Sequence, residues 1–183
     1  MSRSSEETFG VRRLSEEWRD ALQVHFATLS EEDRYLRFGS HCRSEVMHAY
    51  VAHIDFERSI VLGCFDTDAV LRGIAHLNPG PLEWELGLSV DPVCRGQGLG
   101  TRLIRRALKD ARLAGAPRLM MHCLAENHAL LRIVTSLGAQ VVIRDGSAEG
   151  IILCASSRKE FSKDARQRAS RGATAEAVKK TAP

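Results

Sequence analysis

The spacing of apolar residues predicts a helical region near the start of the chain. Residues 8–14, with the sequence TFGVRRL, have the composition of a short strand. Ser15 then precedes two acidic residues, which is typical of a helix start. Two further helix starts are expected at Ser30 and Ser44, so three short helical pieces should follow the first strand. In the first piece, apolar residues recur at helical spacing, at Trp18, Leu22, Phe26 and Leu29.

The middle of the chain changes to the two-residue period of strands. Residues 58–65 and 70–77 are apolar segments, and the Asp66-Thr67-Asp68 turn between them predicts a hairpin. Residues 82–90 alternate strictly, which places their apolar side chains on one face of a strand. The opposite face then carries the polar and small residues, which are Glu83, Glu85, Gly87 and Ser89.

Helices and strands alternate over the remainder of the chain. Residues 99–111 carry an apolar stripe at helical spacing, and Gly115 is expected to end that helix. Residues 118–124 are a predicted strand, residues 126–138 a helix, and residues 139–145 and 150–156 two final strands. This order predicts an α/β fold with a mixed sheet flanked by helices.

Length and composition fit one domain with polar ends. At 183 residues and 44% hydrophobic content the chain can build one substantial core, which we assign to residues 8–155. Residues 1–7 are expected to be a flexible N-terminus. Residues 156–183 carry eight Lys or Arg against three acidic residues and few apolar ones, so a disordered basic tail is expected. No series of aromatic residues interleaves these charges, which argues against nucleic-acid binding.

Cysteine usage and the lengths of the apolar runs bear on location and metal content. Five cysteines form no C-x-x-C pair and no signal-peptide pattern opens the chain, so a reduced, cytoplasmic protein is expected. The apolar runs are well short of the roughly 20 residues that a membrane helix needs, so no membrane association is expected. Histidines and cysteines between residues 41 and 53 show no closed zinc spacing, so we expect no metal.

The glycine-rich segment after the alternating strand is the strongest sign of a ligand. Gly96, Gly98 and Gly100 stand at alternate positions immediately before a predicted helix rich in arginine. Backbone N–H groups that converge at a helix N-terminus bind phosphate, and glycine keeps side chains out of the way. A P-loop would need a lysine after Gly100, and a dinucleotide-binding loop would need a different glycine spacing. The less favoured alternative is a structural turn followed by a solvated basic helix face.

These residues resemble a known signature. The run Arg95-Gly96-Gln97-Gly98-Leu99-Gly100 fits the pattern Arg/Gln-x-x-Gly-x-Gly/Ala, and it follows a strand that ends in Val90-Asp91-Pro92. Downstream, Asn127 stands eleven residues before Gly138. In this order the motifs resemble those of the GNAT superfamily of N-acetyltransferases, over residues 8 to about 155. The resemblance implies a mostly antiparallel sheet of about seven strands, and acetyl transfer from the co-substrate acetyl-CoA to a primary amine.

The resemblance also implies a cofactor site. The pyrophosphate of acetyl-CoA would rest on backbone N–H groups of the glycine loop and the first helical turn, with Arg95 shaping the loop. The strand before the loop would separate from its neighbour and pair with the pantetheine arm through its backbone. The cofactor-binding residues implied in this way are Leu88, Ser89, Val90, Arg95, Gly96, Gln97, Gly98, Leu99, Gly100, Thr101 and Asn127.

Two acidic residues of the alternating strand are candidates for the catalytic base. A lysine amine, with a reference pKa of about 10.4, must lose a proton before it attacks a thioester. Glu85 lies six residues before Asp91, where the family often places a strand glutamate, and Glu83 is the second candidate. Both are ordinary surface acids in the alternative reading. The tyrosine that many family members use as general acid is replaced by Val134, so we expect direct release of the thiolate or protonation by water.

The acceptor is less well defined than the cofactor. The segments LSEEDRYLRF and DFER resemble, more weakly, the catalytic domain of bacterial protein-lysine acetyltransferases, which favours a protein lysine or N-terminal amine. Arg34 and Arg37 in the first segment are candidate acceptor contacts. A small-molecule amine acetyltransferase is one alternative, and a regulatory domain that binds acyl-CoA without turnover is another. The sequence does not determine the acyl chain or the oligomeric state.

Overall fold

The computed structural model of this chain describes residues 10–40 and 42–154. The predicted flexible N-terminus, residues 1–7, and the predicted basic tail, residues 156–183, lie outside the described residues. Within the described part of the chain, no helix has both the length and the apolar character to span a membrane.

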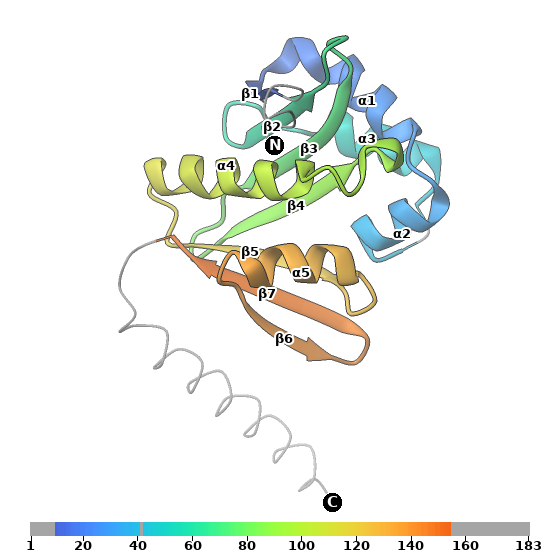
Figure 1. Ribbon diagram of the computed structural model, residues 1–183. Coiled ribbons are helices and arrows are strands. Elements are labelled where there is room, and N and C mark those ends of the chain that lie inside the picture. Colours follow the sequence, from blue (N-terminus) through green and yellow to red (C-terminus); the bar gives the residue numbers. More distant parts are fainter. Residues whose placement is uncertain (1–9, 41, 155–183) are drawn as a thin grey trace, which may run out of the picture.

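One seven-stranded sheet organises the fold (Figure 1). Its strands are β1 (Gly10–Leu14), β2 (Ile60–Phe65), β3 (Leu71–Asn78), β4 (Trp84–Val90), β5 (Arg118–Leu124), β6 (Gln140–Arg144) and β7 (Ser147–Leu153). They lie side by side in the order β1-β2-β3-β4-β5-β7-β6. Neighbouring strands run antiparallel except β4 and β5, which are parallel. The predicted mixed, mostly antiparallel sheet is therefore confirmed.

The helices begin close to the predicted starts. They are α1 (Arg19–Ala27), α2 (Glu31–Phe38), α3 (Ser44–Ala52), α4 (Leu99–Leu113) and α5 (His128–Ser136), with short 3-10 turns η1 (Glu16–Trp18) and η2 (Pro92–Cys94). Ser30 caps α2 reciprocally: its hydroxyl accepts from the N–H of Asp33 at 3.1 Å, and the Asp33 carboxylate accepts from the N–H of Ser30 at 3.3 Å. The start predicted at Ser15 instead opens with η1, and α1 follows directly.

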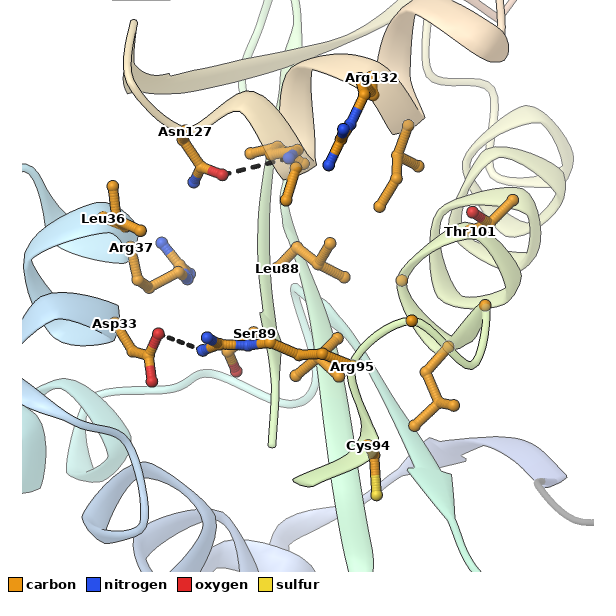
Figure 2. A pocket seen from close by; sticks show the side chains of 18 of the residues that line it. Asp33, Leu36, Arg37, Leu88, Ser89, Cys94, Arg95, Thr101, Asn127 and Arg132 are labelled. Atoms are coloured by element: carbon orange, nitrogen blue, oxygen red, sulfur yellow. Dashed lines mark hydrogen bonds and ion pairs between the residues drawn. The ribbon is translucent and has the colours of Figure 1, made fainter. Parts of the chain in front are cut away.

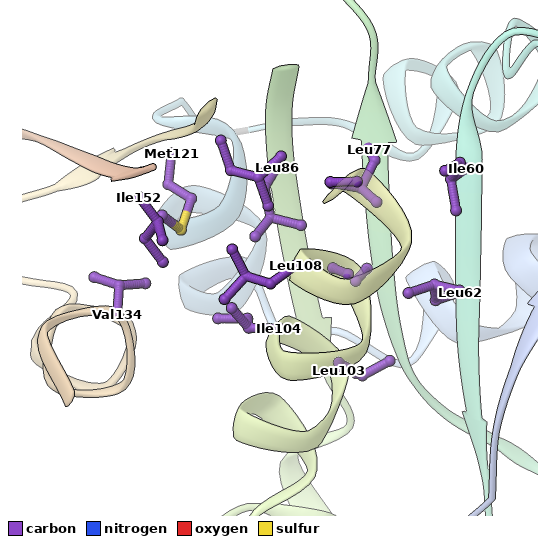
Figure 3. Close-up of a cluster of buried hydrophobic side chains, with 14 of the residues drawn as sticks. Ile60, Leu62, Leu77, Leu86, Leu103, Ile104, Leu108, Met121, Val134 and Ile152 are labelled. Carbon is purple, nitrogen blue, oxygen red and sulfur yellow. The ribbon is translucent and has the colours of Figure 1, made fainter. Parts of the chain in front are cut away.

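The two faces of the sheet bury separate apolar clusters. On one face α4 and α5 lie over the sheet, and Leu103, Ile104 and Leu108 of α4 pack near Leu77 and Leu86 (Figures 1 and 3). The opposite face packs against α1 and α3 in a second cluster, whose members include Leu22, Phe26, Met47, Val51, Val61 and Ile74. Burying one leucine side chain stabilises a fold by about 1.5–3 kcal/mol, so the apolar stripe of α4 holds that helix firmly on the sheet. Its N-terminus is thereby fixed beside the end of β4.

The final hairpin differs from the prediction. The pattern placed the last strand at residues 150–156, whereas β7 begins at Ser147 and ends at Leu153. The turn from β6 consists of Asp145 and Gly146, which have φ angles of 49° and 79°. An Asp-Gly pair with two positive φ angles is favoured in two-residue hairpins, because it matches the twist of the flanking strands. The last strand therefore begins three residues earlier than expected.

Candidate active site

The loop between β4 and α4 is built around a buried carboxylate and two left-handed glycines. Asp91 is buried, and its carboxylate accepts from the N–H of Val93 at 3.2 Å and from Arg72 Nη1 at 2.9 Å. Gly96 and Gly98 have φ angles of 74° and 79°, which side chains disfavour. A Cβ on either glycine would meet no heavy atom within 4 Å, so the space beside the loop is open. Since the N-cap of α4 is a glycine, the first N–H groups of the helix face this space without a side-chain cap.

A cavity of about 430 Å³ lies beside this loop (Figure 2). Its walls come from the loop and first turn of α4, the end of β4, α2, and the start of α5. Ten of the eleven predicted cofactor-binding residues line it, namely Leu88, Ser89, Val90, Arg95, Gly96, Gly98, Leu99, Gly100, Thr101 and Asn127. The eleventh, Gln97, is outside the lining, and its side chain donates to the carbonyl of Val93 at 3.3 Å.

The strands β4 and β5 separate where the cavity begins. They pair in parallel only at Trp84 with Leu119 and at Glu85 with Met120, although β4 continues to Val90 and β5 to Leu124. Figure 1 shows the two strands diverging from this point. From residue 86 onward, the edge of β4 that faces β5 has no strand partner, so its N–H and C=O groups are open to an extended ligand. The separation that the family resemblance implied is therefore present in the described residues.

The wall that α2 provides was only partly predicted. Asp33 is 8% exposed and forms an ion pair with Arg95 of the loop, which ties the start of α2 to the glycine loop (Figure 2). Leu36 and Arg37, one turn further along α2, also line the cavity. Arg37 was predicted from the sequence as a candidate contact of the acceptor, whereas Asp33 was missed as a site residue. The capping pattern from Ser30 to Asp33 was visible in the sequence, but it gives no indication of a partner 62 positions away.

The start of α5 forms the opposite wall. Asn127 caps this helix, with its side-chain oxygen accepting from the N–H of Leu130 at 3.1 Å. Arg132 also lines the cavity, and Figure 2 shows its guanidinium directed toward the open space. Sequence reasoning missed Arg132, which stands one helical turn after the capped end. Val134, at the position of the absent tyrosine, is 1% exposed and belongs to the core.

A buried polar pair lies behind the cavity wall. His25 of α1 is 2% exposed, and its Nε2 lies 2.8 Å from the hydroxyl of Ser89 on β4. Burial lowers the pKa of His25 to about 4, so the imidazole is neutral at pH 7. The side chain of Ser89 therefore anchors β4 to α1, and only the rest of the residue is available to the cavity.

The two candidate bases have different surroundings. Glu83 precedes β4 and forms an ion pair with Arg118 of β5 at 3.0 Å. Glu85 lies within β4 on the face that carries Gly87, and its side chain is exposed. The charge of Glu85 acts on Tyr50. Burial is the main reason that the pKa of the Tyr50 phenol is raised, and the negative charge of Glu85 raises it further. Neither glutamate is part of the cavity lining.

The cavity suits a ligand with phosphate groups at one end. Three cationic residues line it, Arg37, Arg95 and Arg132, against one carboxylate, Asp33. Together with the open helix N-terminus, these charges make the mouth of the cavity electropositive. No group of three or more His, Cys, Asp or Glu side chains within the described ranges is placed to hold a metal ion.

A family model described as the acetyltransferase (GNAT) family matches residues 13–139. The chain belongs to the GNAT family. It is therefore an acetyl-CoA-dependent N-acetyltransferase that acts on an amine. The fold, the family and the co-substrate that the glycine motif indicated are thereby confirmed.

Solved structures share the GNAT fold over most of their length. The GNAT domain of PAT from S. lividans is 18% identical with a TM-score of 0.67, covering 78% of this chain and 89% of that one. YncA from Salmonella typhimurium, solved with acetyl-CoA, is 18% identical with a TM-score of 0.65, covering 82% and 96%. The ribosomal-protein-S18-alanine N-acetyltransferase from Escherichia coli is 14% identical with a TM-score of 0.62, covering 84% and 98%. A search of curated proteins found no match.

Proposed function

We propose that this GNAT enzyme acetylates a primary amine of a protein, either a lysine side chain or an N-terminal amine, with Glu85 as the base. The observation that carries the proposal is the open edge of β4, which runs from the exposed Glu85 to the glycine-lined N-terminus of α4. A thioester carrier with its phosphates at α4 would have its acyl end near Glu85. The exposure of Glu85 leaves the acceptor side accessible to a residue on the surface of a macromolecule.

The residues around the cavity fit acetyl-CoA as co-substrate. The N–H groups at the start of α4 would hold the pyrophosphate, and Arg132 would add positive charge near it. Backbone groups of Leu88 to Val90 would pair with the pantetheine arm along the open edge. Gly96 and Gly98 support this fit, because any larger residue would project a Cβ into the open space that the phosphates need.

The proposed chemistry is a direct transfer. The amine nitrogen attacks the thioester carbon, the carbon–sulfur bond breaks, and the thiolate of CoA leaves. Glu85 is outside the cavity lining, so the amine proton would reach its carboxylate through water. Glu83 is a weaker candidate, because its ion pair with Arg118 already engages its carboxylate. The core position of Val134 supports release of the thiolate without a tyrosine acid.

The accessible acceptor side is the main support for a protein acceptor. The Escherichia coli neighbour, named for an alanine of ribosomal protein S18, also supports it. Acetylation can be followed by thiol release and by mass spectrometry, with a panel of lysine peptides, N-terminal peptides and small amines offered to the wild-type enzyme. Acetylation of peptides is the expected result. Turnover confined to small amines would overturn the protein acceptor while leaving the acetyltransferase assignment intact.

The role of Glu85 is tested by Glu85→Gln. General-base catalysis contributes about 10²- to 10⁴-fold in rate, so kcat should fall by that order while the Kd for acetyl-CoA stays unchanged. Glu45→Gln, which alters an exposed glutamate in the first turn of α3, is the matched control and should behave like wild type. Wild-type kcat in Glu85→Gln would remove this residue from the mechanism.

A further inference from the structure

Arg37 occupies an unusual place in the cavity, because its guanidinium lies against the backbone of β4. A Cβ built on Gly87 would overlap this guanidinium, most closely its Nη2 and Cζ atoms, and even Nη1 would lie only 2.9 Å away. Figure 2 shows Arg37 reaching from α2 toward Leu88, across the cavity from the glycine loop. Gly87 is thus the position on β4 where the absence of a side chain allows a cation to reach the strand.

Neutral groups hold Arg37 in this position. Its Nη2 donates to the Tyr50 hydroxyl at 3.2 Å, and the same hydroxyl lies 2.7 Å from His76 Nδ1. Burial, and the charge of Arg37 in addition, lower the pKa of His76 to about 4, so its imidazole is neutral at pH 7. The Tyr50 oxygen accepts from Arg37, and the hydrogen bond between Tyr50 and His76 joins two neutral groups. Burial also raises the pKa of Tyr50, which keeps the phenol protonated.

The positive charge of Arg37 is not neutralised within the described part of the chain. Its guanidinium donates a hydrogen bond to Tyr50, and no described carboxylate forms an ion pair with it. The carboxylate of α2 that faces the cavity, on Asp33, pairs instead with Arg95. A partly buried cation whose direct hydrogen-bond partner is neutral favours a ligand that brings negative charge.

The position along β4 indicates which negative charge this is. Pairing with β5 ends at Glu85, and the cavity wall begins at Leu88, so Gly87 lies between the base and the backbone that would pair with pantetheine. A carrier with its phosphates at α4 has its thioester at this point of the strand. The phosphates lie at the other end of the cavity, where the helix N-terminus and Arg132 are available to them.

We propose that Arg37 is a catalytic residue whose guanidinium contacts the thioester carbonyl oxygen and stabilises the oxyanion of the acetyl transfer step. This inference rests on the transfer proposed above. As the amine nitrogen bonds to the carbonyl carbon, the C=O electron pair moves onto oxygen and places a full negative charge there. When that pair returns, the carbon–sulfur bond breaks and CoA leaves as thiolate, while the amine proton passes to the base. Arg37 thereby places a fixed positive charge where the negative charge of the intermediate develops.

Gly87 has a matching role as a positioning residue. Because a methyl group there would meet the guanidinium, Gly87→Ala should displace Arg37 from the strand. The double variant Gly87→Ala with Arg37→Gln should then be no slower than Arg37→Gln alone. Additive losses in the double variant would contradict the shared role of these two residues.

The kinetic test compares Arg37→Gln, Arg37→Lys and the control Arg43→Gln, which alters an exposed arginine at the start of α3. Loss of one oxyanion donor costs about 10²- to 10³-fold in kcat, so Arg37→Gln should show that loss with nearly unchanged KM for acetyl-CoA. Arg37→Lys keeps the charge and should recover part of the rate.

Two other results would assign Arg37 a different role. A rise in the acceptor KM alone would make Arg37 an acceptor contact, and a rise of more than tenfold in the Kd for acetyl-CoA would make it a phosphate contact. Either result, or unchanged kinetics, overturns the proposal.

An infrared measurement tests Arg37 without turnover. Acetyl-CoA labelled with ¹³C at the acetyl carbonyl is bound to each variant in the absence of acceptor, and the C=O stretch is recorded. Wild type and Arg43→Gln should shift the stretch to lower wavenumber, and Arg37→Gln should lose this shift. An equal shift in wild type and Arg37→Gln overturns the proposal. If the wild type acetylates no amine, the proposed function fails, and the infrared comparison still decides the contact between Arg37 and the carbonyl.

Discussion

Substitution of Gly98 by alanine tests whether the N-terminus of α4 binds the phosphates of acetyl-CoA, because it combines a conformational cost with a loss of binding. Gly98 has φ 79° and ψ 5°, and a Cβ there would meet nothing within 4 Å. The cost to stability is therefore conformational, about 1–2 kcal/mol for an L-residue in the left-handed region. For a domain of this size, each kcal/mol lowers Tm by about 2–4 °C. We expect the melting temperature to fall by a few degrees.

The effect on acetyl-CoA should be larger than the effect on stability. Gly98 is the N-cap of α4, so a methyl group or a small shift of the loop should disturb the N–H groups that are proposed to bind the phosphates. A hydrogen bond to a charged group is worth about 1.5–3 kcal/mol, and losing one weakens binding by about 10- to 100-fold. Isothermal titration calorimetry with acetyl-CoA measures this change, and differential scanning calorimetry measures Tm.

Gly115 provides the matched control at the other end of α4. It has φ 80°, and a Cβ there would also meet no heavy atom within 4 Å. Gly115→Ala should therefore lose as much Tm as Gly98→Ala while binding acetyl-CoA as wild type does. Equal affinities of the two variants for acetyl-CoA would refute phosphate binding at the N-terminus of α4. An unchanged Tm in both variants would refute the conformational argument.

Two further predictions concern stability. Leu103 of α4 is fully buried against the sheet, so Leu103→Ala should lower the free energy of unfolding by about 2–5 kcal/mol in urea denaturation. A smaller loss would show that the core relaxes into the space left by the substitution. Burial lowers the pKa of His25 in the folded protein from the ordinary value of 6.5 to about 4, so the unfolded state binds more protons between these two pH values. Stability should fall as pH drops from about 6.5 to 4, by roughly 3 kcal/mol at most from this group. His25→Gln should flatten that slope, and an unchanged slope would exclude His25 as its source.

The features that the sequence predicted well are local ones. The alternation of residues 82–90 predicted β4 because each side chain of a strand reports its face, and Leu86 is indeed buried while Glu85 is exposed. The glycine loop and α4 were likewise predicted, since three glycines followed by an apolar stripe at helical spacing are typical of a turn that leads into a helix. The Asp145-Gly146 hairpin was also a local signal, and reading it would have placed β7 correctly.

The features that the sequence could not predict depend on how distant elements dock. The ion pair between Asp33 and Arg95 joins residues 62 positions apart, and the approach of Arg37 to Gly87 depends on where α2 lies against β4. Gln97 matched the glycine motif as well as its neighbours did, yet its side chain turns back to the backbone of Val93. A motif defines a backbone path, whereas the direction of each side chain depends on tertiary contacts.

The limited pairing of β4 with β5 has a consequence for how the protein avoids self-association. An unpaired strand edge is a template for β-strands of other chains, which need a uniform spacing of about 4.8 Å along the whole edge. Here the unpaired stretch lies inside a sheet that is closed at Trp84 and widens toward Val90, so the gap is a wedge. A foreign strand cannot keep ladder spacing to both sides of a wedge. The same geometry that exposes backbone groups to a slender ligand thus makes them a poor nucleus for aggregation.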